Sequence, residues 1–340
     1  MPTVASLGEF GLIARIARMT PTAPSVVEGI GDDCAVLRIG DRLVLVSCDL
    51  SIENVHWRRS HALAESIGWK AAASALSDIA AMGGAPLFCL VSLACPDDTE
   101  TSLVDGLYEG MLDAVKQCGA VIVGGDTTRS ADGIVIDVVV IGEPVGDRYL
   151  TRKGAQPGDA LVVTGRLGLS AAGLHALESD RGDLSETDST RPAASEKPRL
   201  LRAHCHPTPR IQEGQWLAAR PVVHAMIDIS DGLIQDAGHL AEAAHLGVDV
   251  DQSMLSVDPD LMSYCREGGL DPYDFMLAGG EDYELAFAVA GGRSDALVQA
   301  FRGKFHTDIS VVGTFTDAWQ GVRIAGEPPS KTGFDHFRQP

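Results

Sequence analysis

Residues 75–84 read ALSDIAAMGG, and this stretch decides how the first half of the chain folds. It lies in an Ala-rich apolar run that predicts one long helix over residues 62–82. Asp78 falls inside that helix, where an isolated carboxylate is unfavourable unless it faces solvent or a ligand. The stretch therefore predicts a packed helix that presents a functional acid on its surface.

The elements around this helix follow an α+β order, without regular strand–helix–strand alternation. Residues 154–159 form a turn-rich junction after which a second series of strands and helices begins. We expect two domains, 1–150 and 151–340, because 340 residues exceed the usual size of a single core. In the first half, helices are predicted at 9–19, 62–82 and 99–118, and strands at 34–39, 43–48, 87–95, 120–123 and 134–141. In the second half, strands are predicted at 160–164, 225–229, 283–289 and 309–313, helices at 209–219 and 233–245, and a polar surface loop at 178–197.

Composition and charge exclude several classes of protein. A formal net charge of −20 disfavours binding to nucleic acid or an anionic membrane surface, since both need clustered Lys and Arg. The seven cysteines form no CxxC pair and are expected to be reduced thiols. No apolar run approaches the roughly 18–20 residues needed to cross a bilayer, and no secretory signal is recognisable at the N-terminus. We therefore expect a cytoplasmic protein.

Five short segments share one sequence pattern, in which an acidic residue stands beside Gly or Ser at the end of an apolar run. They are GIGDDCAV (29–36), VSCDLS (46–51), ALSDIAAMGG (75–84), VIVGGDTTR (121–129) and IDISDGL (227–233). Two carboxylates about 4 Å apart repel by roughly 4 kcal/mol at an effective dielectric near 20, so a gathered set needs a cation. None of the six lysines lies in these segments, which favours a hard divalent ion such as Mg²⁺ bound by oxygen ligands.

A plainer interpretation stays open for each acid taken alone, because Asp is common at helix N-caps and turns. Asp231, which precedes Gly232, fits an N-cap, yet the same position would aim the first NH groups of a helix at a phosphate. The chain has neither a P-loop nor the Gly-rich, H-R-D and D-F-G motifs of protein kinases. His204, Cys205 and His206 are adjacent, so we do not expect all three to converge on one zinc ion.

Taken in order, the segments resemble the thiamine-monophosphate kinases, relatives of aminoimidazole ribonucleotide synthetase and selenophosphate synthetase. The resemblance covers nearly the whole chain. It rests on GEFGLIARI (8–16), GIGDDCAV (29–36), SCDLSIENVHW (47–57), ALSDIAAMGGAPL (75–87), GGDTTR (124–129), LTRKGAQPGD (150–159), HPTPRI (206–211), IDISDGL (227–233), GGEDYEL (279–285) and GFDHF (333–337).

This resemblance implies a two-domain synthetase-like fold. Its N-terminal domain would form a β-barrel across a homodimer, flanked by helices, and its C-terminal domain would be α/β. It also implies that ATP, with several Mg²⁺ ions, phosphorylates thiamine monophosphate to thiamine diphosphate, the final step of that biosynthesis. The transfer is expected to be direct and in line, without a phosphoenzyme.

Site residues follow from the resemblance position by position. The implied metal ligands are Asp33, Ser47, Cys48, Asp49, Asp78, Asp126, Asp228 and Asp231. The implied ATP contacts are Gly125, Asp126, Arg152 and Ser230, and the implied substrate contacts are His56, Glu281 and Phe334. Asp49, Asp126 and Arg152 are expected to carry catalysis. Cys48 departs from the family pattern, which usually has Thr there; because a thiol is a poor partner for Mg²⁺, a metal contact would use backbone oxygen or be lost.

Two alternatives stay open. An aminoimidazole ribonucleotide synthetase-like enzyme is disfavoured by the segments ENVHW (53–57) and GGEDYEL (279–285). A nucleotide-binding regulator that has lost catalysis finds its best support in Cys48. A selenophosphate synthetase would need a reactive Cys near a Gly-rich N-terminus, and a hydrogenase-maturation carrier would need a cysteine-bearing tail; this sequence has neither.

Overall fold

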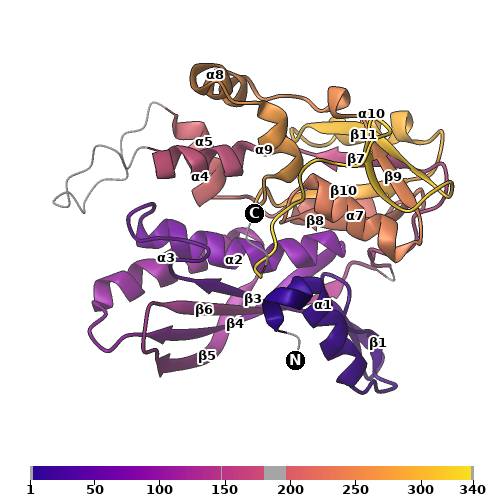
Figure 1. Cartoon of the computed structure of the whole chain (residues 1–340). Coiled ribbons are helices and arrows are strands. Elements are labelled where there is room, and N and C mark those ends of the chain that lie inside the picture. Colours follow the sequence, from indigo (N-terminus) through magenta and orange to yellow (C-terminus); the bar gives the residue numbers. More distant parts are fainter. Residues whose placement is uncertain (1–2, 147, 180–196, 338–340) are drawn as a thin grey trace.

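The computed structural model describes residues 3–146, 148–179 and 197–337. The chain folds into two halves, each built on one six-stranded sheet (Figure 1). Most of the polar loop predicted at 178–197 lies outside the described residues, while its first two residues end a helix. No described helix has both the length and the apolar character needed to cross a membrane.

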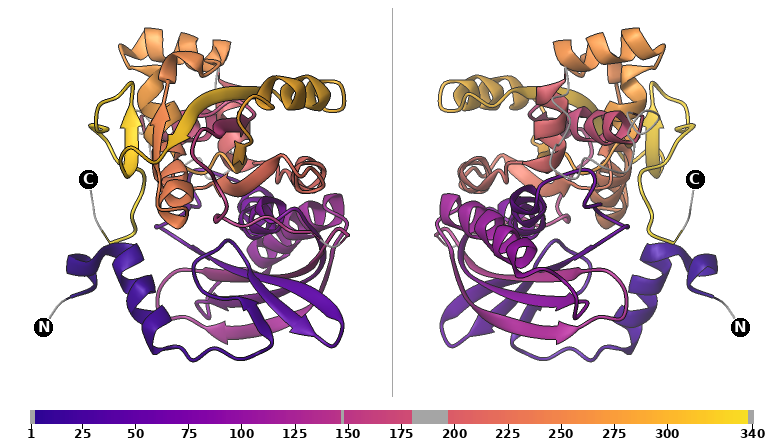
Figure 2. Two further views of the ribbon diagram at one scale, coloured as in Figure 1. Left: turned by 90° about the vertical axis from the view of Figure 1, so that its right-hand side faces the viewer. Right: turned by 90° about the vertical axis from the view of Figure 1, so that its left-hand side faces the viewer.

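The first sheet has the strand order β1-β2-β3-β6-β4-β5, in which only the β4–β5 pair is parallel. Its strands are β1 (Val26–Glu28), β2 (Ala35–Ile39), β3 (Arg42–Ile52), β4 (Gly84–Cys95), β5 (Val121–Arg129) and β6 (Val135–Pro144). Helices α2 (Ala64–Ala81) and α3 (Thr101–Gln117) cover one face, and α1 (Val4–Met19) lies beside β1 (Figures 1 and 2). We call the face under α2 and α3 the inner face and the opposite face the outer face.

The second sheet has the order β12-β9-β11-β7-β10-β8 and is also mixed, since only β9 and β12 run parallel. Its strands are β7 (Ala160–Thr164), β8 (Val223–Ile229), β9 (Gly247–Val250), β10 (Glu284–Val289), β11 (Ile309–Thr316) and β12 (Gly321–Ile324). The helices of this half are α4 (Leu169–Ser179), α5 (Pro198–Cys205), α6 (Ile211–Ala218), α7 (Leu233–Ala243), η2 (Gln252–Met254), α8 (Pro259–Gly268), α9 (Pro272–Ala278) and α10 (Ser294–Arg302).

Helix α2 joins the two halves into one packed body. Its alanines from Ala71 onward are almost fully buried, and the apolar cluster that contains Leu76 and Ile79 also contains Leu217 and Phe287 from the second half. The approach is close, because a Cβ on Gly214 of α6 would lie 2.1 Å from the carbonyl oxygen of Ala80. The Ala-rich composition of α2 is therefore explained by packing on both sides, with the first sheet below and the second half above.

The structure confirms the mixed two-domain character and corrects several details. The strands predicted at 43–48 and 120–123 continue to Ile52 and Arg129, so Asp49 and Asp126 lie within strands rather than after their ends. Polar groups can stand in a strand when they face a cavity or solvent, which an apolar-run criterion does not detect. The prediction missed β1, β9, β12, α4, α5, α8, α9 and α10 and started α1 too late. Among the described residues both sheets are open.

Candidate active site

A cavity of about 1420 Å³ lies where α1, β3, α2, the β8–α7 turn and the C-terminal segment meet. It gathers groups that are far apart in the sequence, and twelve of the predicted site residues line it. They are Asp33, Ser47, Cys48, Asp49, His56, Asp78, Arg152, Asp228, Ser230, Asp231, Glu281 and Phe334. Gly125 and Asp126 do not line it.

Three acids from separate elements meet at the centre of the cavity. Asp33 follows β1, Asp78 lies in α2 and Asp228 lies in β8, and one carboxylate oxygen of each lies within 4.8 Å of the other two. Ser77 Oγ donates a hydrogen bond of 2.7 Å to Asp228, and Ser47 Oγ donates one to Asp78. The helix and both sheets thus position the acidic cluster, with hydroxyl groups orienting two of its carboxylates.

Burial and mutual repulsion disfavour full ionisation of this cluster. Burial is the largest cause for each acid, and for Asp78 and Asp228 the neighbouring acids add to it, so the pKa of Asp78 is well above its usual range and that of Asp228 is about 8. For Asp33, burial raises the pKa against the opposing charge of Arg152. Asp33 Oδ2 is buried without a hydrogen-bond partner among the described residues. Buried carboxylate oxygens that repel one another and lack donors fit a divalent cation with oxygen ligands.

Arg152 is the one cation in contact with this cluster among the described side chains. Its guanidinium donates to Asp33 Oδ1 through Nε at 3.0 Å and through Nη2, and its backbone NH donates to Asp32. The side chain of Asp33 is fully buried, whereas that of Arg152 is 21% exposed toward the cavity. Arg152 therefore has one face on the acid and another available to a bound anion.

The strand register separates Asp126 from Asp49. Paired residues form rows across strands β3, β6, β4 and β5. One row is Asp49, Val138, Val91 and Gly125, and the next row is Leu50, Asp137, Ser92 and Asp126. Side chains in one row share a face, so Asp49 with buried Val138 faces inward, whereas Asp126 faces outward with exposed Leu50. Cys48 also lies on the outer face and is exposed. Within one chain, Asp126 does not join the acidic cluster.

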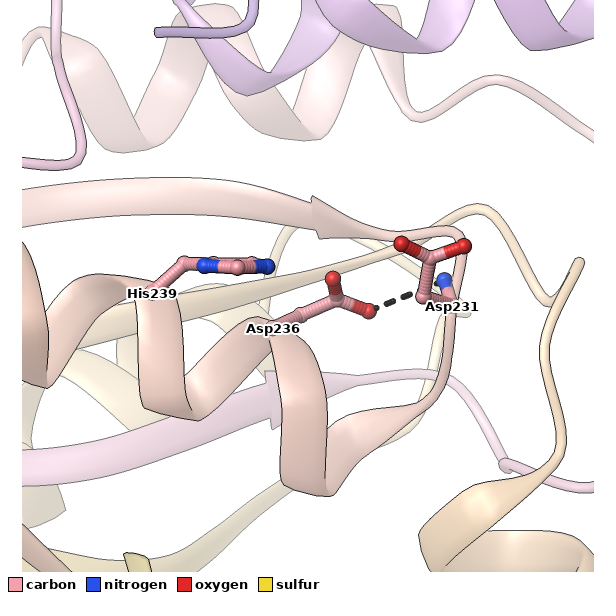
Figure 3. A group of neighbouring side chains, drawn as sticks. All are labelled: Asp231, Asp236 and His239. Carbon is pink, nitrogen blue, oxygen red and sulfur yellow. Dashed lines mark hydrogen bonds between the residues drawn. The ribbon is translucent and has the colours of Figure 1, made fainter. Parts of the chain in front are cut away.

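A second group lies at the start of α7, where Asp231, Asp236 and His239 bring one ligand atom each within 4.8 Å of the others (Figure 3). Gly232, not Asp231, is the N-cap, and the buried Asp236 carboxylate accepts hydrogen bonds from the backbone NH groups of Asp231 and Gly232. The ring of His239 lies against Phe10, with centroids 4.3 Å apart. Asp236 thus fixes the turn that presents Ser230 and Asp231.

His56, Glu281 and Phe334 line the other end of the cavity. His56 contacts His336 edge to face, with centroids 5.0 Å apart, and His336 contacts Phe334 in the same way. The backbone of Phe334 is held by hydrogen bonds with Asp231 and Gln235, although the residue as a whole is 49% exposed. The C-terminal segment therefore runs beside α1 (Figure 1), where Phe334 and His336 line the cavity.

Sequence reasoning missed four residues of the site, namely Lys70, Asp236, His239 and His336. The Asp-x-x-His spacing of Asp236 and His239 places both on one helical face and could have been found. His204 and His206 have different partners, since their Nε2 atoms lie 3.4 Å from Lys70 Nζ and 2.8 Å from Ser66 Oγ. The two rings therefore diverge, as expected of adjacent residues.

Comparisons with known proteins agree with this geometry. Residues 31–143 match the N-terminal domain of AIR synthase related proteins, and residues 156–325 match the C-terminal domain. The thiamine-monophosphate kinase of Aquifex aeolicus is 34% identical over 331 residues, covering 97% of this chain and 98% of its own length. That of Escherichia coli K12 is 35% identical over 339 residues, covering 98% and 99%. The chain belongs to the thiamine-monophosphate kinase family.

A solved structure of this family extends the comparison to the fold. It is described as AaThiL complexed with AMPPCP and TMP, is 31% identical and superposes with a TM-score of 0.83 over 99% of both chains. The match extends over both halves of the chain, and residues from both halves line the cavity. The similarity therefore includes every element that lines the cavity.

The titration of the buried acids gives a first prediction. Burial first, then the charge of Asp33, raises the pKa of Asp32 to about 7, and that of Asp228 is about 8. Because the folded state holds these protons more tightly than the unfolded state, their contribution to stability is complete below about pH 4 and is lost as pH rises through about 7 to 8. We expect the melting temperature of the metal-free protein to fall between about pH 6 and pH 8.5, measured by calorimetry.

Mg²⁺ should reverse this loss, because it neutralises the ionised acids in the folded state only. The increase in melting temperature on adding Mg²⁺ should be larger at pH 8 than at pH 6. The variant Asp228→Asn should show a smaller pH dependence and a smaller response to Mg²⁺. An identical Mg²⁺ response at both pH values would contradict the assignment of the acidic cluster as a cation site.

Proposed function

We propose that this chain is a thiamine-monophosphate kinase that transfers the γ-phosphoryl group of ATP to thiamine monophosphate, in the cytoplasm, as the last step of thiamine diphosphate formation. The observation that carries the proposal is the similarity along the whole chain to a solved structure complexed with AMPPCP and TMP. The cavity supports it independently, because it joins an acidic cluster to a substrate end lined by His56, Glu281 and Phe334.

The acids are assigned to Mg²⁺, which the donor set fits. Asp33, Asp78 and Asp228 would form its centre, with Ser47 and Asp49 on the adjacent stretch of β3 and Asp231 at the start of α7. When bound, Mg²⁺ ions would neutralise the phosphates and polarise the transferred group. Cys48 points to the outer face, so a metal contact there would use its backbone oxygen.

The reaction needs no protein nucleophile. An anionic phosphate oxygen of thiamine monophosphate forms a bond to the γ-phosphorus while the bond from that phosphorus to the β–γ bridging oxygen breaks, and ADP leaves. Arg152 faces the cavity from Asp33 and would stabilise charge on the transferred phosphoryl group. Ser230, in the turn that Asp236 fixes, would contact an ATP phosphate. His56, Glu281 and Phe334 would bind the rings of thiamine monophosphate.

A direct assay tests the proposal against its alternatives. Incubation of the protein with γ-labelled ATP, Mg²⁺ and thiamine monophosphate should yield labelled thiamine diphosphate and unlabelled ADP. Nucleotide binding without product would instead identify a regulator. Activity only with an amidine precursor of aminoimidazole ribonucleotide would identify a synthetase of that type.

The homodimer belongs to the same proposal. The outer face of the first sheet exposes Leu50 (57%), Phe88 (44%), Val121 (55%) and Val123 (56%), and β5 is an unpaired edge in the described chain. Exposed apolar side chains on an open sheet favour association with a second copy. Closure of two such sheets into a barrel would enclose Asp126 with Cys48, next to the backbone of Gly125, where they can meet a nucleotide. The division into domains near residue 150 then separates this dimerising half from the second sheet.

We expect Val123→Asp to convert the dimer into a monomer, because it places a charge in the apolar interface. Light scattering coupled to size-exclusion chromatography measures the mass directly. Leu112→Asp is the matched control, since Leu112 is 49% exposed on α3, over the inner face. If Val123→Asp keeps the mass of a dimer, the outer face is not the interface.

A further inference from the structure

Helix α2 carries a buried lysine at the substrate end of the cavity. Lys70 is 8% exposed, and its Nζ lies 2.6 Å from Glu281 Oε1 and 3.4 Å from His204 Nε2. Lysine is almost never this buried unless it is paired. The ammonium group therefore has a specific task at this place, and the mechanism above does not use it.

The position of Lys70 relates the two ends of the cavity. Lys70 and Asp78 are eight residues apart on one helix, so they are separated by about 12 Å along its axis. Asp78 belongs to the acidic cluster, and Ser77 beside it hydrogen-bonds Asp228. One rigid helix thus holds both the acidic cluster and the contact to Glu281, and it fixes the distance between them.

Glu281 is held in an unusual conformation. Its φ of 65° lies in the left-handed region, which costs free energy for a residue with a side chain, and its backbone NH donates to Ser230. Burial opposes ionisation, but the charge and the hydrogen bond of Lys70, together with smaller contributions from His204 and His56, outweigh it and hold the pKa of Glu281 below its usual range. Burial and the charge of Lys70 lower the pKa of His204 to about 3, so His204 is neutral.

The two carboxylate oxygens of Glu281 have different neighbours. Oε1 is bound by Lys70, while Oε2 lies 3.4 Å from Nδ1 of His204, whose own hydrogen-bond partner is Ser170 Oγ at 3.2 Å. The side chain of Glu281 is 26% exposed and lines the cavity. Lys70 therefore holds the Glu281 carboxylate on one side, while the side chain remains partly open to the cavity.

We propose that Lys70 is a positioning residue for the substrate, which holds the Glu281 carboxylate as an anion in one orientation toward the cavity. The inference rests on the proposed function, in which Glu281 binds thiamine monophosphate. The substrate carries an aromatic amine and a cationic thiazolium ring, and a fixed carboxylate oxygen suits either group. Lys70 acts through Glu281 and leaves the transferred phosphoryl group to Arg152 and the metal site.

The test compares KM with kcat in the full-length protein. Lys70→Met should raise the KM for thiamine monophosphate about 10- to 100-fold, because it leaves the Glu281 carboxylate buried and without its cation, while the KM for ATP changes less than about twofold. Lys116→Met, an exposed lysine of α3, is the control and should leave both constants unchanged. Binding of thiamine monophosphate in the presence of AMPPCP and Mg²⁺, measured by calorimetry, should weaken by the same factor.

A double variant tests whether Lys70 acts through Glu281. If it does, Lys70→Met combined with Glu281→Gln should raise the KM for thiamine monophosphate no further than the larger single effect. The double variant buries no lone carboxylate, so it replaces Lys70→Met in the comparison if that protein does not fold. Additive effects, a loss confined to kcat, or a KM equal to that of Lys116→Met would overturn the inference. Wild-type protein that forms no thiamine diphosphate would instead refute the proposed function.

Discussion

Replacing Asp78 with Asn is expected to reduce phosphoryl transfer about 10³-fold, because the variant removes a charge from the centre of the acidic cluster. The fold should survive, since the Asn carbonyl oxygen can still accept the hydrogen bond that Ser47 donates to Asp78. Steady-state assays with saturating ATP and thiamine monophosphate measure the loss. The KM for thiamine monophosphate should change little, because Glu281, a proposed substrate contact, meets α2 at Lys70, eight residues before Asp78.

The same variant should be more stable than the wild type when metal is absent. The pKa of Asp78 is well above its usual range because of burial and of repulsion by Asp49, Asp228 and Asp33, so folding is opposed wherever Asp78 must ionise. Metal-free Asp78→Asn should therefore melt at a higher temperature near pH 8, and its response to Mg²⁺ should shrink. Asp113→Asn, on the exposed side of α3, is the control. Wild-type activity in Asp78→Asn would exclude Asp78 from the site.

The acidic cluster could be predicted from the sequence because its signal is local. A carboxylate is unfavourable in an apolar core. The sequence shows such carboxylates in an Ala-rich helix and, beside Gly or Ser, at the ends of apolar runs. The structure brings together Asp33, Asp78 and Asp228, three of the acids that this sequence pattern singles out. The two-domain α+β character could also be predicted, because the order of helices and strands is likewise read from local sequence patterns.

Two features could not be predicted because they depend on register and on distant contacts. Cys89 pairs with Ile122 but Leu90 pairs with Gly124, so β5 holds one extra residue. An extra residue reverses the alternation that follows it, which turns Asp126 to the outer face. Lys70 stands in an Ala-rich helix with nothing nearby to mark its role, and its partner Glu281 lies on the other half of the chain. Only the fold shows that the two meet.

Arg152→Met is expected to lower turnover about 10²- to 10³-fold, because it removes the cation that the proposed function assigns to the transferred phosphoryl group. It should also lower the free energy of unfolding of the metal-free protein by about 3 kcal/mol, since the fully buried Asp33 loses its guanidinium partner. Chemical denaturation followed by circular dichroism measures the second effect, and assays at saturating Mg²⁺ measure the first. Added Mg²⁺ should restore stability but not turnover.

The neighbouring lysine separates a charge effect from a site effect. Lys153 pairs with Glu28 at 2.7 Å on the surface, and its side chain is 59% exposed, so Lys153→Met removes the same charge outside the cavity and should cost under about 1 kcal/mol. Arg152→Lys keeps the charge but loses the two-point contact to Asp33, and its turnover should fall between the wild type and Arg152→Met. If Mg²⁺ restores the turnover of Arg152→Met as well as its stability, Arg152 serves only to neutralise Asp33. If Mg²⁺ restores the stability of Arg152→Met but not its turnover, the charge of Arg152 acts on the substrate.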